Sequence, residues 1–155
     1  AVMRGPAGWP DLRLRVTGLL QVARKAPEVH VRVHACGSGA PRSGYETMQR
    51  ILKAWTPSAL LCVNDATAEG AMRALRERGI RVPQDLSVVG FDDTEGAEYC
   101  CPPLTTVRQP RTEMGRRGAA ELLRPLSTSR AGGYGSNVTV LDGDLVVRGA
   151  TCPPT

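Results

Sequence analysis

Carboxylate, amide and guanidinium side chains follow the apolar segments of this 155-residue chain. Asn64 and Asp65 come directly after the apolar run 59–63, and Asp92 and Asp93 come directly after the run 86–91. Such groups accept hydrogen bonds from hydroxyl pairs or donate them to oxygens, so as a set they suit a polyhydroxylated ligand. They can act on one ligand only if the fold places them side by side.

Catalytic signatures do not accompany these groups. The sequence contains no G-x-S-x-G elbow, no G-x-x-x-x-G-K-[ST] loop and no H-E-x-x-H. On a regular strand Asp92 and Asp93 point to opposite faces, so they form a carboxylate dyad only if the backbone turns sharply there. His30 and His34 lie on a predicted strand, about 13 Å apart, which is too far for a shared metal. We therefore expect no enzyme, no metal site and no cofactor.

The apolar pattern alternates between strands and helices. Runs at 1–3, 29–34, 59–63 and 86–91 predict strands, and segments with helical spacing follow the first three. The helices are expected to start at Asp11, at the capping-box pair Ser43 and Glu46, and at Asp65, with Gly79 at the third helix exit. This order predicts an α/β fold, a Rossmann-like parallel sheet with helices on both faces. Its carboxyl edge would collect Arg4, Cys36, Asn64, Asp65, Asp92 and Asp93.

Beyond Pro102-Pro103 the pattern loosens. The run 104–107 predicts a strand beside the strand 86–91, and Thr112 is expected to cap a short, imperfect helix. A Gly- and Ser-rich loop is predicted over 127–136. The runs 137–141 and 145–147 flank Asp142-Gly143 and predict a hairpin, unless the chain crosses between two lobes and the runs join different sheets.

Composition excludes several classes of protein. The net charge is +5, but the 20 basic residues are scattered and give no focused patch for phosphate. Five cysteines without a C-x-x-C spacing argue against a disulfide scaffold or zinc site and favour a reducing cytoplasm. No apolar run reaches 18 residues, so no membrane span is expected. The chain opens with a strand-like run at Ala1, which suggests a piece of something longer.

Spaced motifs over 57–110 resemble one family. They are Val-Asn-Asp-x-x-Ala-x-Gly at 63–70, Val-Val-Gly-Phe-Asp-Asp at 88–93 and Pro-Pro-Leu-Thr-Thr-Val at 102–107. In them the chain resembles the lactose- and galactose-repressor (LacI/GalR) family of transcription regulators. The resemblance implies the C-terminal lobe of a two-lobed, type I periplasmic-binding-protein-like effector domain. It also implies three parts: the lobe at 1–108, a segment of the other lobe at 109–142, and a return strand and tail at 143–155.

The resemblance also implies ligand-reading residues, namely Arg15, Asn64, Asp92 and Gln109. Asp92 would accept hydrogen bonds from ligand hydroxyls, Arg15 would donate, and Asn64 would bridge. Each has an ordinary structural interpretation as well. Asn64 could instead stabilise the strand-helix turn, and Arg15 could be a surface helix residue. Asp65 is interpreted as a helix cap rather than a ligand contact.

The implied function is effector sensing in a bacterial transcription regulator. A small sugar-like effector would alter affinity for operator DNA, which is bound through a headpiece absent from this chain. The family resemblance implies a cytoplasmic homodimer with no membrane contact. The alternative is a solute-binding protein of a sugar transport system, and a sugar-modifying enzyme is a weaker third interpretation.

Overall fold

A parallel sheet forms the centre of the computed structural model, which describes residues 1–6, 8–127 and 138–153. Its strands are β1 (Val2–Arg4), β2 (Val33–Ala35), β3 (Ala59–Cys62) and β4 (Ser87–Val89), in the order β2-β1-β3-β4. Next to β4 runs β5 (Thr106–Arg108), joined to it by single parallel bridges, and β6 (Asp144–Val146) pairs antiparallel with β5. The predicted α/β fold with a parallel sheet is confirmed.

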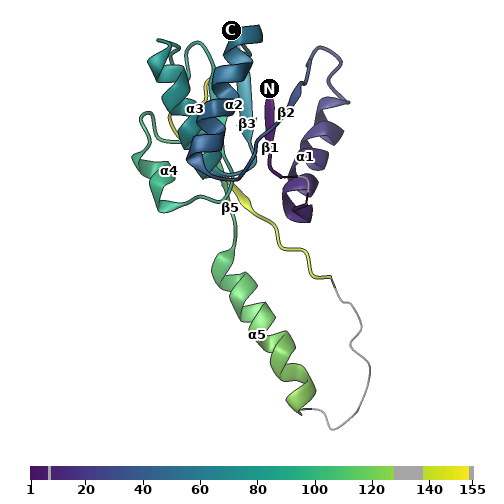
Figure 1. Ribbon diagram of the computed structural model, residues 1–155. Coiled ribbons are helices and arrows are strands. Elements are labelled where there is room, and N and C mark those ends of the chain that lie inside the picture. Colours follow the sequence, from purple (N-terminus) through teal and green to yellow (C-terminus); the bar gives the residue numbers. More distant parts are fainter. Residues whose placement is uncertain (7, 128–137, 154–155) are drawn as a thin grey trace.

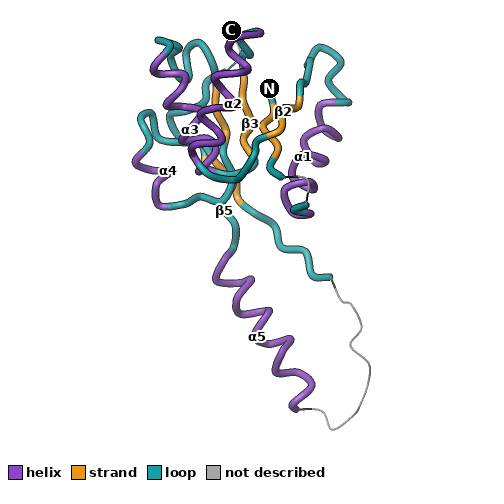
Figure 2. Tube along the Cα trace, in the orientation of Figure 1, coloured by secondary structure: helices purple, strands orange, loops and turns teal. Residues whose placement is uncertain are grey.

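Helices cover both faces of the sheet (Figures 1 and 2). On one face lies α1 (Pro10–Ala23), and on the other lie α2 (Pro41–Ala54), α3 (Asp65–Glu77) and the short α4 (Glu95–Tyr99). Alternation along β1 explains this division, because Val2 packs with Leu12 and Val16 of α1 whereas Met3 belongs to the larger core under α2 and α3. The sequence pattern did not predict α4.

Several predicted boundaries are wrong by a few residues. Helix α1 begins at Pro10 instead of Asp11, and α2 begins at Pro41 instead of Ser43. A proline in the first turn fixes φ and needs no hydrogen-bonded N–H, so it starts both helices without a side-chain cap. The hydroxyl of Ser43 donates to the carbonyl oxygens of Ser38 and Ala40 instead of capping. The predicted strand 29–34 is replaced by the shorter β2 at Val33–Ala35, which pairs with the three residues of β1.

The last third of the chain leaves the sheet and returns to it. Helix α5 (Arg111–Ser127) is longer than predicted and extends away from the other elements (Figure 1). The predicted hairpin is wrong: residues 138–141 form no strand, and β6 takes β5 as its partner. Gly143 permits this approach, since a Cβ there would lie 2.8 Å from the carbonyl oxygen of Arg108. Of the predicted loop 127–136 and the run 137–141, residues 128–137 lie outside the described residues.

Exposed apolar side chains occur on α5, where Met114, Leu122 and Leu123 are 47%, 78% and 60% exposed. This helix is nevertheless too short and too polar to cross a bilayer, as is every other helix in the described ranges. Its apolar residues contrast with those of α2 and α3, which lie buried against the sheet.

Two glycines set the spacing between α2 and α3. A Cβ at Gly44 would lie 2.1 Å from the carbonyl oxygen of Thr67, and a Cβ at Gly70 would lie 1.8 Å from that of Pro41. Both clashes are with backbone, which cannot move aside as a flexible side chain can. The two helices therefore pack at a distance that only glycine allows, and this holds the start of α3 in place.

We predict that Gly70→Ala lowers the free energy of unfolding by about 2–3 kcal/mol, the usual cost of forcing atoms into a packed contact. Gly118→Ala on α5 is the matched control, because a Cβ at that position would meet nothing within 4 Å. That substitution should stabilise by up to about 1 kcal/mol through helix propensity. Urea unfolding followed by circular dichroism measures both. Equal effects of the two substitutions would contradict the close packing of α2 on α3.

Candidate functional site

Three of the four predicted ligand residues converge after β4. The Oδ1 atom of Asp92 lies 3.1 Å from Nη1 of Arg15 and accepts a 2.5 Å hydrogen bond from Nε2 of Gln109. Arg15 comes from α1, Asp92 follows β4, and Gln109 lies between β5 and α5. Elements far apart in the sequence thus bring a guanidinium, a carboxylate and an amide to one point.

Arg15 is held in place from two further directions. Its Nη1 donates to the carbonyl oxygen of Val63 at 2.6 Å, at the exit of β3. Its guanidinium carbon lies 4.0 Å from the ring centroid of Phe91, a cation–π contact. With the Arg15 side chain only 15% exposed, these contacts orient a charge that a surface helix residue would leave in solvent. The interpretation of Arg15 as an ordinary surface residue does not fit this geometry.

A cleft of about 270 Å³ adjoins this cluster. Its walls come from α1, from the β4 exit, and from the two segments that connect the sheet with α5. The lining residues are Arg15, Phe91, Val107, Gln109, Pro110, Met114, Thr139, Leu141 and Gly143. A lining that combines polar donors with apolar side chains is typical of sites for small polar molecules that have an apolar face.

Burial raises the pKa of Asp92 above its ordinary value, although Arg15 and the hydrogen bond from Gln109 act in the opposite direction. Asp65 also contributes to the rise by its charge. The Asp92 carboxyl, 26% exposed, is therefore a partly desolvated acceptor. A ligand hydroxyl that donates to it would meet little competition from water.

Asn64 lies next to Val63, but its side chain takes partners away from the Asp92 cluster. Its Oδ1 accepts from the backbone N–H of Thr67 at 2.9 Å, which makes Asn64 the N-cap of α3, and its Nδ2 donates to the carbonyl oxygen of Gly39 at 3.0 Å. These contacts fit the structural interpretation of Asn64 as a stabiliser of the strand-helix turn. Its ligand-bridging role stays a prediction.

Asp65 is not the helix cap that the sequence suggested. Its side chain is fully buried; Oδ2 accepts from the N–H and the hydroxyl of Thr94 at 2.8 and 3.2 Å, and Oδ1 accepts from the hydroxyl of Thr106 at 2.6 Å. Asn64 takes the capping position because it is the last extended residue before α3. Asp65 instead ties the start of α3 to the loop after β4 and to β5.

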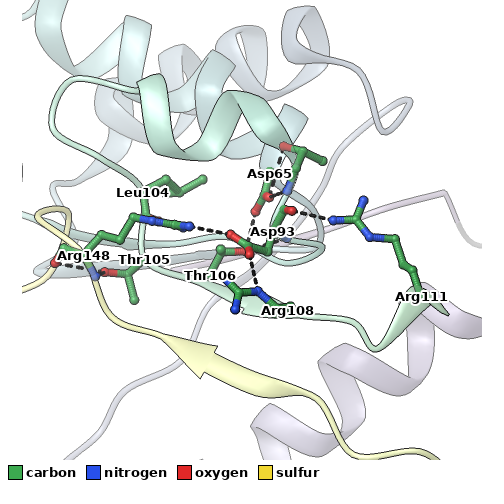
Figure 3. Close-up of polar contacts among 9 residues, drawn as sticks. Asp65, Asp93, Leu104, Thr105, Thr106, Arg108, Arg111 and Arg148 are labelled. Atoms are coloured by element: carbon green, nitrogen blue, oxygen red, sulfur yellow. Dashed lines mark hydrogen bonds and ion pairs between the residues drawn. The ribbon is translucent and has the colours of Figure 1, made fainter. Parts of the chain in front are cut away.

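The backbone turns sharply at Asp92 and Asp93, where φ is 113° and 49°. The condition for a carboxylate dyad is met, yet the two side chains take separate partners. Asp93 is only 8% exposed, with Oδ2 accepting from Nε of Arg108 at 2.6 Å and Oδ1 from Nη2 of Arg148 at 2.7 Å (Figure 3). Desolvation opposes ionisation of Asp93, but these two arginines hold its pKa below the ordinary value.

The chemistry available at this corner is hydrogen bonding and charge. No group of three or more His, Cys, Asp or Glu side chains suited to a metal ion occurs among the described residues. The residues that sequence reasoning missed are Phe91, Arg108, Arg111 and Arg148. Arg108 precedes the predicted Gln109 and could have been found as its neighbour on β5. Arg148 carried no signal, because its approach depends on the pairing of β5 with β6.

Comparison with known proteins gives a consistent picture. Residues 3–151 match the family model described as a periplasmic binding protein-like domain. The HTH-type transcriptional repressor CytR of Escherichia coli K12 is 34% identical over 149 residues, which are 95% of this chain and 43% of that protein. The HTH-type transcriptional repressor PurR of Haemophilus influenzae PittEE is 37% identical over 113 residues, 72% of this chain and 34% of that protein. The chain thus spans less than half the length of these curated relatives.

Solved structures show the same likeness. The Lac repressor dimer bound to operator and the anti-inducer ONPF superposes with a TM-score of 0.85 and 36% identity, over 97% of this chain and 51% of that one. The transcriptional regulator CelR in its cellobiose complex gives a TM-score of 0.84 and 31% identity, over 97% and 46%. At 36% and 31% identity, the likeness to these two structures extends to the amino-acid sequence as well as to the fold.

We predict that Asp65→Asn lowers the free energy of unfolding by about 2–3 kcal/mol. The amide replaces one acceptor oxygen by a donor, which leaves a hydroxyl or the Thr94 N–H unpaired in the core. Asp85→Asn is the control, because it removes an exposed carboxylate paired with Arg81, and such pairs contribute below about 1 kcal/mol. Guanidinium unfolding of both variants measures the difference. Similar losses for the two would contradict the anchoring role of Asp65.

The pKa values of Asp92 and Asp93 are shifted in opposite directions, so we predict that their effects on stability depend on pH in opposite ways. The folded pKa of Asp93 is depressed, so its stabilisation is present above its ordinary value of 3.8 and is lost as pH falls through the folded pKa. The folded pKa of Asp92 is raised, so its contribution to the free energy of unfolding is fully present below 3.8 and is lost as pH rises through the folded pKa. The destabilisation by Asp93→Asn should therefore shrink between pH 7 and pH 3, and that by Asp92→Asn should grow. Chemical unfolding at both pH values measures this, and parallel trends would contradict it.

Proposed function

The chain belongs to the family of periplasmic binding protein-like domains, in the form found in Lac repressor and CelR, and we propose that it is the effector-sensing part of a DNA-binding transcription regulator. The observation that carries the proposal is the convergence of Arg15, Asp92 and Gln109 beside a cleft, within a fold shared with these regulators. The effector is a sugar or a related small polar molecule.

The chemistry of the cleft and of the carboxylate beside it supports this class of effector. Asp92 offers a partly desolvated acceptor, and Arg15 and Gln109 offer donors that are already oriented. A hydroxylated ligand that bridges these groups would exchange the protein's own hydrogen bonds for new ones of similar strength, so the gain comes from pre-organisation. Apolar lining side chains such as Val107, Met114 and Leu141 would receive the carbon face of a ring. Asn64 joins the site if its Nδ2 exchanges Gly39 for the ligand.

A two-lobed arrangement accounts for the exposed surfaces. We propose that residues 1–108 form the C-terminal lobe, that 109–142 belong to a second lobe, and that 143–155 return to the first. The support is that α5 extends from the sheet with exposed Met114, Leu122 and Leu123, which a second lobe would cover. The relatives are more than twice as long as the matched segment, which leaves room for that lobe and for a DNA-binding headpiece.

The intact regulator is proposed to be a cytoplasmic homodimer that binds operator DNA and responds to its effector. Lac repressor is a dimer bound to operator in one solved structure, and CytR and PurR are HTH-type repressors. The same relationships favour a non-enzymatic function, because these relatives are repressors. A change in effector affinity would then be coupled to operator affinity through two conformations of the protein.

We predict that Asp92→Asn weakens effector binding about 10- to 100-fold without preventing folding. The amide keeps the shape but loses the charge-assisted acceptor, and such hydrogen bonds contribute about 1.5–3 kcal/mol each. The assay is calorimetric titration of the intact protein with D-galactose, D-ribose, cellobiose and adenosine, followed by operator binding at fixed salt. Arg15→Lys should also weaken binding, because the ammonium keeps the charge but loses the fork of donors and the stacking on Phe91.

The control is Arg42→Lys, which alters an exposed arginine paired with Glu46 on α2 and should bind as the wild type does. Full effector response in Asp92→Asn would refute the site. An intact protein that binds a sugar but no operator would favour a solute-binding protein instead.

A further inference from the structure

The two described connections between the sheet and α5 both contact one buried carboxylate, that of Asp93. The outgoing connection is Arg108 to Arg111, and the returning one enters through β6 and continues to Arg148. Figure 3 shows Asp93 between them, with Arg108 and Arg148 pointing toward its carboxylate from the two connections. We propose that Asp93 is a positioning residue that clamps both connections to the β4 exit and thereby fixes where α5 and Gln109 lie. The inference rests on the proposed function for its role in effector sensing.

The outgoing connection and the β5 residue before it are held at three points. Arg108 donates from Nε to Oδ2 of Asp93 at 2.6 Å, and Arg111, the first residue of α5, donates from Nη2 to the carbonyl oxygen of Asp93 at 2.6 Å. The N–H of Asp92 donates to the carbonyl oxygen of Val107 at 2.9 Å. The start of α5 is thus fixed to the same two residues that follow β4.

Arg148 holds the returning connection at this corner. Its Nη2 donates to Oδ1 of Asp93 at 2.7 Å, its Nη1 donates to the carbonyl oxygen of Leu104 at 2.9 Å, and its side chain is 17% exposed. Its backbone N–H donates to the hydroxyl of Thr105 at 3.0 Å. One guanidinium therefore ties the returning segment to the start of β5 and to Asp93 simultaneously. Loss of the Asp93 charge would leave this partly buried arginine without its anionic partner.

Effector binding has a direct route to this clamp. Asp92 and Asp93 share one peptide bond and both have positive φ, a conformation that side chains other than glycine adopt at a cost. Asp92 contacts Gln109 on the outgoing connection. Asp93 contacts Arg108 on the outgoing connection and Arg148 on the returning one. A ligand that displaces Gln109 from the Asp92 carboxylate removes that hydrogen bond and leaves the contacts of Asp93 in place. The contacts of Asp93 with Arg108 and Arg148 then limit how far the two connections can move.

Hydrogen–deuterium exchange of the intact protein tests the clamp without any ligand. Asp93→Asn keeps the side-chain shape and the tolerance for positive φ and removes the charge. We expect exchange in the segments 105–109 and 144–148 to be at least about tenfold faster, while α3 exchanges as in the wild type. Asp85→Asn is the matched control, because it also removes a carboxylate bonded to an arginine, Arg81. It should leave both segments unchanged.

A double-variant cycle separates the clamp from a general loss of stability. Arg148→Met should accelerate exchange over 144–148, and adding Asp93→Asn should accelerate it little more, because both act through one contact. Asp92→Asn, which removes the proposed effector contact, should leave 144–148 protected. Unchanged exchange in Asp93→Asn, or fully additive effects in the cycle, overturns the clamp. Effector binding that survives in Asp92→Asn overturns the proposed function instead and leaves the exchange result to decide the clamp.

Discussion

A buried carboxyl group, that of Asp65, is the constraint on which this corner of the molecule depends. A fully buried carboxyl is costly unless its oxygens are hydrogen bonded, and three donors from two threonines meet it. Those donors lie on the loop after β4 and on β5, so the need to satisfy one side chain fixes where both segments run. A Cβ at Gly90 would lie 2.3 Å from Oδ1 of Asp65, which explains why the chain carries no side chain at that point. The loop that this carboxyl fixes also carries Asp92, whose carboxylate meets Arg15 and Gln109.

The fold was largely predictable because most of its strands and helices leave a local signal. Apolar runs that end in polar pairs indicated the sheet and its carboxyl edge, and the run 104–107 was correctly expected beside β4. The failures lie where a competing contact decides. Pro10 and Pro41 start helices ahead of the expected caps, and β6 pairs with β5 instead of its neighbour in sequence. Propensity alone cannot rank such alternatives, because tertiary contacts contribute more than local preference does.

The site shows the same division. The grouping of Arg15, Asp92 and Gln109 followed from the family resemblance, and the structure brings these three together. The cap of α3 is Asn64 instead of Asp65, because the cap is the last extended residue before the helix, and the sequence pattern does not show to within one residue where the extended segment ends. Arg148 was not foreseen at all. Its contact with Asp93 spans 55 positions and exists only because the chain returns to the sheet after α5.

In the proposed function, the different surroundings of Asp92 and Asp93 would let one corner both bind the effector and transmit its binding. Asp92 is partly exposed, has a raised pKa and shares its acceptor atom between Arg15 and Gln109, so its contacts are open to exchange with a ligand. Asp93 is buried, has a depressed pKa and holds two arginines, so its contacts resist exchange. A conformational change needs one interaction that a ligand can replace and another that is retained in both states, because a site in which every tie breaks would lose its geometry. The sharp turn at these residues is what separates the two roles. On a straight strand the side chains would face opposite sides of the sheet, and the cleft and the connections to α5 could not share one peptide.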